Sequence, residues 1–191
     1  TSTAKIADEI GRVVTITPEV INPMAVGADI HKIVIDERED VDIETAGEIN
    51  VDAHGSVYIG SETNNINVNL IKTDTDDDIR IKTGQGIYNV AADLTTANII
   101  GGNTILEAAE GSIGTEATPI ITDLGADATL TGRAKNSVYI VEKAGNMNLE
   151  FMYAETGGVY LTADNSIVDA LDTDFTKIAA NEIVLNATNG T

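Results

Sequence analysis

The chain has 191 residues, a net charge of −20 and no cysteine. This acidity excludes a nucleic-acid partner, because affinity for nucleic acids comes mainly from Lys and Arg that neutralise phosphates. The lack of cysteine excludes a disulfide framework and a thiolate metal site. No apolar run in the sequence approaches the roughly 18 residues that a membrane-spanning helix needs. We therefore expect no nucleic-acid binding and no insertion into a membrane.

Residues 1–40 show a less regular pattern than the rest of the chain. Residues 10–16 and 29–35 each read as a strand, because apolar and polar positions alternate. Pro18 and Pro23 interrupt this pattern, since proline cannot donate to a strand ladder. We interpret this irregular N-terminal part as irregular first coils, an inserted hairpin or a cap.

Residues 41–191 form a series of short segments in which apolar and polar residues alternate. Alternation over three to six residues predicts β-strands, and no stretch keeps the spacing of a long helix. Glycine and asparagine, as in Gly84-Gln85-Gly86 and Ala144-Gly145-Asn146, separate the segments and tolerate the positive φ of a sharp corner. Such an all-β pattern fits an antiparallel sandwich or barrel, or a parallel β-helix.

Internal repeats favour the β-helix. Ser56-Val57-Tyr58-Ile59 returns at 137–140, 81 positions later, and again 21 positions after that as Gly158-Val159-Tyr160-Leu161. Residues 105–111 return as 184–190, 79 positions later. A solenoid repeats in this way because every coil meets the same environment. We predict coils of about 20 residues, about nine in number. Val and Ile should point inward and Tyr outward, with both Ser-Val-Tyr-Ile copies on one face, about four coils apart.

The second half of the chain resembles a known family. The residues that carry the resemblance include Gly102-Asn103-Thr104-Ile105-Leu106-Glu107-Ala108, Asn136-Ser137-Val138-Tyr139-Ile140, Gly145-Asn146-Met147-Asn148-Leu149 and Gly158-Val159-Tyr160-Leu161-Thr162-Ala163. They are similar to the haemagglutinin-like repeats of filamentous-haemagglutinin-type adhesins, which are very large secreted bacterial proteins. The resemblance covers 101–191 well, 42–104 loosely and 1–40 not at all.

The resemblance implies a right-handed parallel β-helix over residues 41–191, exported to the cell surface, with no catalytic residues. It implies the role of a stalk or adhesive fibre that is part of a longer parent chain. The partners would be a glycan or protein on a host or neighbouring cell, or further repeats of the same parent. Because a solenoid end has unpaired strand edges, we also expect end-to-end self-association.

The densest acidic cluster comprises Asp74, Asp76, Asp77 and Asp78. Six to eight oxygen ligands hold Ca²⁺ in proteins, and this cluster is a candidate calcium site. Its spacing matches neither the EF-hand loop nor the nonapeptide of calcium-binding β-rolls, so a solvated loop is the alternative interpretation. A weaker second candidate comprises Asp169, Asp172 and Asp174.

Three functions remain as hypotheses. A structural stalk is the first, and a calcium-assisted module that binds a glycan or protein is the second. The third is a glycosidase that uses paired carboxylates, although neighbouring coils bring acids together without any catalytic role. Asp52, His54 and Tyr58 resemble a base site, but His54 precedes Gly55 at an expected corner and reads as an exposed turn residue. The four arginines are scattered along the sequence, which argues against a basic groove for polyanions.

Overall fold

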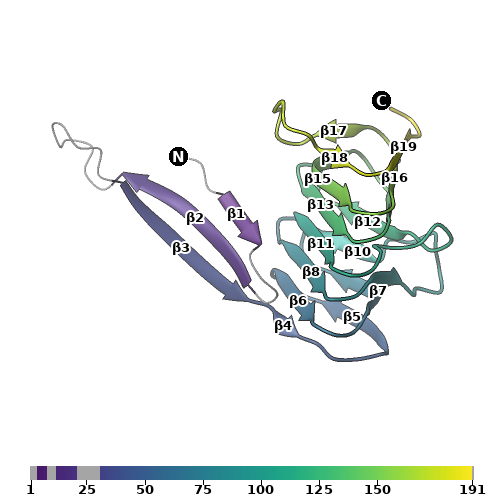
Figure 1. Cartoon of the computed structure of the whole chain (residues 1–191), viewed down its shortest axis with the longest axis horizontal. Coiled ribbons are helices and arrows are strands. Elements are labelled where there is room, and N and C mark those ends of the chain that lie inside the picture. The colour runs from purple at the N-terminus through teal and green to yellow at the C-terminus, as the bar shows by residue number, and fades with distance from the viewer. Residues whose placement is uncertain (1–3, 8–11, 21–30, 191) are drawn as a thin grey trace.

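The computed structural model describes the backbone of residues 4–7, 12–20 and 31–39, and backbone and side chains of residues 40–190. The described residues form strands and turns and no helix. Most strands stack into a parallel β-solenoid, in which the chain winds upward from β4 to β19 (Figure 1). This confirms the predicted fold class.

The N-terminal strands form a separate antiparallel sheet: β1 (Ala4–Ala7), β2 (Arg12–Val20) and β3 (His31–Glu39). Strand β2 pairs with both others. The expectation that Pro18 interrupts the strand is wrong, because β2 continues through Pro18 to Val20. Strand β3 extends past the expected end at 35 to Glu39, through four charged residues. Pro23 lies outside the described residues.

Two parallel sheets form the walls of the solenoid, and the chain alternates between them. Sheet I contains β4 (Val41–Asp42), β6 (Val57–Ser61), β8 (Ile79–Thr83), β11 (Thr104–Ala108), β13 (Thr129–Ala134), β15 (Met147–Ala154) and β17 (Ile167–Asp169). Sheet II contains β5 (Glu48–Asp52), β7 (Ile66–Lys72), β10 (Ile99–Gly101), β12 (Ile120–Leu124), β14 (Val138–Glu142), β16 (Gly158–Ala163) and β19 (Glu182–Ala187). Two short strands are side members: β9 (Ile87–Asn89) pairs with β7, and β18 (Ile178–Ala179) pairs with β15.

The strand register gives the length of each coil. Ile59 pairs with Ile81, 22 positions later, and Ile81 pairs with Leu106, 25 positions later. Val138 pairs with Val159 after 21 positions. Each wall has seven strands along its main path, so the solenoid has about seven coils of about 22 residues. The prediction of nine shorter coils therefore overestimates the count, because β1–β3 form a separate sheet and two outward loops lengthen the coils that carry them.

The repeated Ser-Val-Tyr-Ile motif lies on both walls, which corrects the predicted register. Val57 is in β6 of sheet I, whereas Val138 is in β14 of sheet II. The second repeat is divided between the walls in the same way. Its first copy, residues 105–111, begins in β11 of sheet I, and its second copy, residues 184–190, begins in β19 of sheet II. The long repeat thus spans three and a half coils rather than four. The copies at 137–140 and 158–161, which are 21 positions apart, do stack in register, with Tyr139 beside Tyr160.

The core is a set of columns of branched aliphatic side chains between the two walls. Along β14, Val138 and Ile140 are buried and Tyr139 between them is partly exposed, which confirms the predicted orientation. On the opposite wall, Ile81 and Leu106 pair in register and are fully buried, so sheet I adds columns of its own to the core. Burying such a side chain contributes roughly 1.5–3 kcal/mol, so the stacked columns provide most of the stability of the solenoid.

Two successive coils carry an outward loop at the same corner of sheet II. The first loop, residues 90–98, separates β9 from β10, and the second, residues 115–119, precedes β12. Gly114 directly precedes the second loop and has a φ of 65°, a conformation that favours glycine. Asn98 is buried and fastens the loops to the wall. Its amide donates to a carbonyl of β7 at 3.3 Å, and its oxygen accepts from Ile121 N–H at 2.8 Å.

Candidate functional site

The predicted calcium-binding aspartates form a turn between β7 and β8. Asp77 N–H donates to Asp74 C=O at 3.0 Å, and the Asp78 carboxylate accepts from the side-chain amide of Asn103 at 3.0 Å. The Asp76 side chain is exposed. The structure thus places the four carboxylates along one turn. The Asp78 carboxylate contacts Asn103, and the Asp74 carboxylate contacts His54. Within residues 40–190, no three His, Asp or Glu side chains are arranged to hold a metal ion.

The second acidic candidate comprises Asp169, the last residue of β17, and Asp172 and Asp174 in the loop that follows. The Asp169 carboxylate accepts backbone N–H donors from Leu171 at 2.8 Å and Thr173 at 3.2 Å. Desolvation raises the pKa of Asp169, but these two hydrogen bonds and the nearby Lys177 ammonium together outweigh it, so the pKa lies below its usual value. Asp169 therefore shapes the loop as an ionised turn residue.

The imagined base site around His54 is a surface corner. The His54 side chain is 95% exposed, and its Nδ1 lies 3.4 Å from an Asp74 carboxylate oxygen. This agrees with the expectation of an exposed turn histidine. Tyr58 lies in β6 of sheet I, while Asp52 ends β5 of sheet II. The three residues thus come from two different walls and the corner between them.

The C-terminal end of the solenoid is an open surface. Ile183 and Leu185 of β19 stack in register on Val159 and Leu161 of β16. The two residues of β16 are fully buried, whereas Ile183 is 46% exposed and Leu185 48% exposed. The difference arises because β16 is covered from both sides and β19 from one. The end therefore presents core-type side chains together with an unpaired strand edge.

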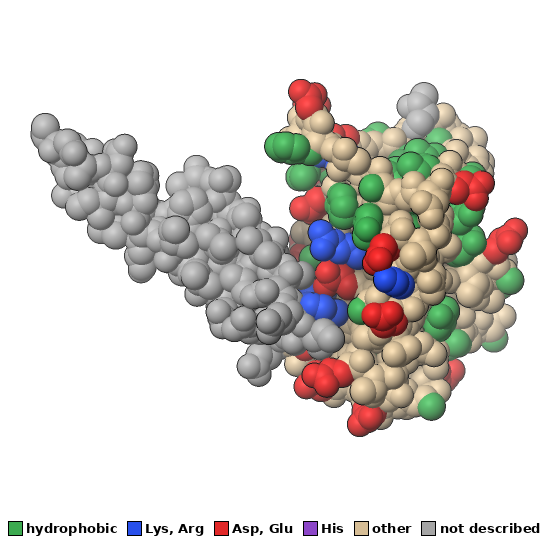
Figure 2. Space-filling view, viewed as in Figure 1, with side chains coloured by type: hydrophobic (Ala, Val, Ile, Leu, Met, Phe, Trp, Pro, Cys, Tyr) green, Lys and Arg blue, Asp and Glu red, His purple; other side chains and the backbone are tan. Residues whose placement is uncertain are grey.

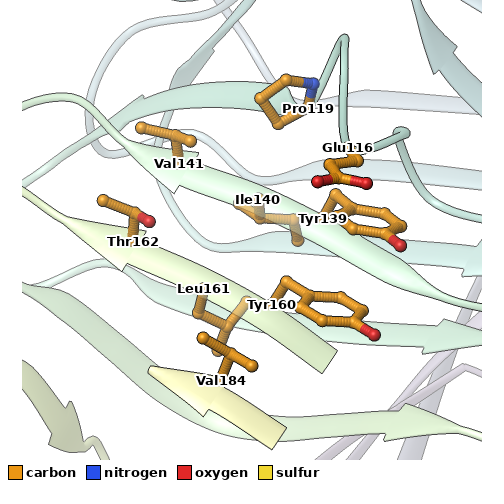
Figure 3. A pocket seen from close by; sticks show the side chains of 9 residues that line it. All are labelled: Glu116, Pro119, Tyr139, Ile140, Val141, Tyr160, Leu161, Thr162 and Val184. Atoms are coloured by element: carbon orange, nitrogen blue, oxygen red, sulfur yellow. The ribbon is translucent and has the colours of Figure 1, made fainter. Parts of the chain in front are cut away.

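A groove of about 380 Å³ lies on the outer face of sheet II, next to the second outward loop. Figure 3 shows Tyr139 and Tyr160 side by side on adjacent strands, with Glu116 and Pro119 of the loop above them. The two rings are parallel within 4°, and their centroids are 4.5 Å apart. Val184 continues this column toward the open end.

Hydrogen bonding fixes the tyrosine column. The Tyr160 hydroxyl donates to the Glu182 carboxylate at 2.6 Å, which raises the pKa of Tyr160 to about 12. Gly158 makes room for the ring, because a Cβ at this position would lie 2.7 Å from ring atoms of Tyr160. The two rings are thus held against the sheet as one stacked pair, shared by two neighbouring coils.

Sequence reasoning missed two groups of residues. Glu142 occupies an inward position of β14 and is 1% exposed. Its alternation with Val138 and Ile140 indicates the inward direction, but a glutamate at that position reads as polar and outward. The second group is a set of basic residues on sheet I, including Arg80 and Arg133, which the sequence separates by 53 positions.

We compared the chain with known proteins by family model, by curated sequence and by solved structure. No family model, no curated protein and no solved structure matches it. Among the described residues, no helix has the length and apolar character to cross a membrane.

Proposed function

We propose that the chain is a non-catalytic stalk segment of a bacterial surface or secreted adhesin, extracellular in location. The observation that carries this proposal is the open C-terminal coil, in which Ile183 and Leu185 continue the core columns in register and remain half exposed. A further β-coil stacked there would bury both side chains and pair the free edge of β19. The architecture can therefore be lengthened without redesign.

The regularity of the solenoid supports this proposal. Seven strands per wall at about 4.8 Å spacing give a rod about 30 Å long. Asparagine and threonine side chains join successive coils at the corners. Asn165 donates to Asn146 at 2.8 Å, and Thr156 donates to the carbonyl of Lys135 at 2.9 Å. Such contacts repeat between nearest neighbours, so that each coil stabilises the next, as a spacer requires.

The test asks whether cell adhesion depends on the length of the segment or on its surface side chains. It is carried out in the full adhesin that contains the segment. In-frame removal of 138–158, the stretch that begins with β14 and contains β15, deletes one coil and should preserve the register. We expect cell adhesion to fall with the loss of reach, and adding a coil should restore it. The charge substitution Asp127→Asn, at an exposed turn, should leave adhesion unchanged.

Two outcomes would contradict the stalk. Loss of adhesion on Asp127→Asn, with circular dichroism and melting unchanged, would show that adhesion depends on surface chemistry at this turn and not on the length of the segment. Turnover of a neutral polysaccharide that is lost when one carboxylate is changed to its amide would assign the chain to the glycosidases.

A further inference from the structure

The outer face of sheet I gathers the basic side chains of this acidic chain. Of the seven Lys and Arg side chains that the structure describes, four lie on β8, on β13 or directly after β13: Arg80, Lys82, Arg133 and Lys135. Figure 2 shows Lys and Arg side chains grouped on this face, with acidic side chains between them. The remaining three are Lys72, Lys143 and Lys177.

The strand register explains this convergence. Lys82, Glu107, Arg133 and Tyr153 pair in succession across β8, β11, β13 and β15, so they form one outward column along the rod. A hollow of about 220 Å³ lies beside this column. Ala109 lines it on one side. Because alanine is small, the hollow stays open between the larger side chains.

Within residues 40–190, Arg133 is the one cation of this group with no acidic partner. Lys135 donates to Glu155 at 2.8 Å, while Arg80 pairs with Asp40 at 3.0 Å and lies 3.6 Å from Glu107. The exposed Arg133 guanidinium lies 5.2 Å from the centre of the Phe151 ring, and none of the carboxylates that the structure describes pairs with it. Stacking on an aromatic ring holds a guanidinium flat and leaves its N–H fork free for a carboxylate.

Glu107, which lines the hollow, and its neighbour Arg80 have polar atoms without hydrogen bonds. Arg80 is 1% exposed, and its Nε and Nη2 have no hydrogen-bond acceptor among the described side chains. In the same part of the structure, the Glu107 Oε2 atom has no donor within hydrogen-bond distance. Buried polar atoms without partners are rare in folded proteins and call for a ligand or an ordered water. Among the described residues, the hollow thus combines the unpaired Arg133 guanidinium with a Glu107 carboxylate oxygen whose ion-pair contacts, 3.6 Å to Arg80 and 4.0 Å to Lys82, are longer than hydrogen bonds.

We propose that this hollow binds a carboxylate-bearing sugar of an acidic polysaccharide. The carboxylate pairs with the N–H fork of Arg133, and the sugar ring packs against Tyr153, whose side chain is over one third exposed. Ring hydroxyls hydrogen-bond with Glu107 and the amino groups of the neighbouring lysines. Concave sites of this kind combine an apolar surface with a few polar groups that fix the orientation of the ligand.

The fold favours a sugar over an acidic peptide. Peptides often bind a sheet by adding a strand to a free edge. Strand β11 lies between β8 and β13 and is paired on both sides, so the backbone around the hollow offers no free edge. Recognition must therefore proceed through side chains. A compact ring with one carboxylate fits the Arg133 guanidinium, which has no acidic partner within residues 40–190.

The test uses a tetramer of galacturonate and its fully methyl-esterified form as a neutral probe, both with a chelator present. Binding is measured by calorimetry and by the NMR shift of the Arg133 Nε–H. We expect the acid to bind and the ester to bind at least about tenfold more weakly, because a charge-assisted hydrogen bond is lost. Arg133→Gln should weaken acid binding by a similar factor, and Arg133→Lys should weaken it less.

Lys143→Gln is the matched control, because it removes one positive charge from an exposed residue directly after β14 of sheet II. It should leave affinity for the acid unchanged, while circular dichroism checks that each variant folds. The proposal is overturned if the acid does not bind, or if acid and ester bind equally. It is equally overturned if Lys143→Gln and Arg133→Gln have the same effect, or if a tetraglutamate peptide binds as tightly as the sugar acid.

Discussion

Glu142 makes the stability of the solenoid depend on pH. The side chain is buried between the two walls, where its Oε2 accepts from the Thr122 hydroxyl at 2.8 Å and its Oε1 from Leu124 N–H at 3.1 Å. Desolvation by burial is the largest effect on the group and outweighs these hydrogen bonds. It raises the pKa of Glu142 to about 7 from an ordinary value of 4.5.

The direction and size of the effect follow from this shift. A carboxyl whose pKa is raised by folding stabilises the folded state when protonated, and this contribution is complete below pH 4.5. It is lost as the pH rises through about 7, because the unfolded chain releases the proton more easily. At about 1.4 kcal/mol per pH unit, the loss amounts to about 3 kcal/mol.

The substitution Glu142→Gln removes the titrating proton and keeps the shape of the side chain. The amide oxygen can still accept from Leu124 N–H, and the Thr122 hydroxyl can turn toward the Val141 carbonyl, which lies 3.3 Å away. We expect the variant to exceed the natural chain by about 3 kcal/mol in free energy of unfolding at pH 8. At pH 4 the two should be nearly equal.

Urea denaturation at intervals between pH 4 and pH 8 measures this difference directly. Glu62→Gln is the control, since it removes the same charge from an exposed side chain and should show little dependence on pH. Subtracting the free energy of unfolding of the natural chain from that of each variant removes the contribution of the other carboxylates, which both chains share. A Glu142→Gln difference that does not change across this range would refute the reasoning.

Three further predictions concern the core, the corners and the acidic turn. Leu130→Ala removes a fully buried side chain and should cost about 3 kcal/mol, while Leu185→Ala at the half-exposed end should cost less than half as much by chemical denaturation. Gly84→Ala should lower the melting temperature by several degrees, because its Cβ would overlap a backbone carbonyl of the preceding coil. Gly55→Ala is the control, because a Cβ at this position meets open space, and it should have little effect on the melting temperature. Equal melting-temperature shifts for Gly84→Ala and Gly55→Ala would contradict this account. Millimolar calcium should leave the melting temperature unchanged, since partners already occupy part of the acidic turn. A rise that Asp76→Asn abolishes would instead establish a calcium site.

The fold could be predicted from the sequence because its two signals are local. Alternation within short segments identifies strands, and glycine and asparagine identify corners. In the structure, Val138, Ile140 and the residues that stack on them are buried as alternation predicts. The repeat then distinguishes a solenoid from a sandwich, since only stacked coils repeat their surroundings.

The register between distant coils could not be predicted. Both walls accept the same inward aliphatic and outward tyrosine pattern, so a motif can recur after three and a half coils as readily as after four. The outward loops at 90–98 and 115–119 also lengthen two coils without interrupting the walls. Extrapolating the short repeat therefore overestimates the number of coils and assigns Val57 and Val138 to the same wall.

The surface sites depend on this register. Lys82 and Arg133 are 51 positions apart in sequence and come together because two successive coils, through Glu107, bring them to one column. Glu142 was missed for another reason: its environment is set by Thr122 and Leu124 of the preceding coil. Short-range patterns contain no information about either contact.

The most direct test of the stalk is to add a coil at the open end. Residues 164–187 lead from β16 to β19 and end in register with Ala163, so a second copy inserted after Ala187 should stack on the first. We expect hydrogen exchange of Ile183 and Leu185 amides in the original β19 to slow toward the rates of β16. Unchanged exchange, with the added copy unfolded, would contradict the claim that this end accepts a further coil.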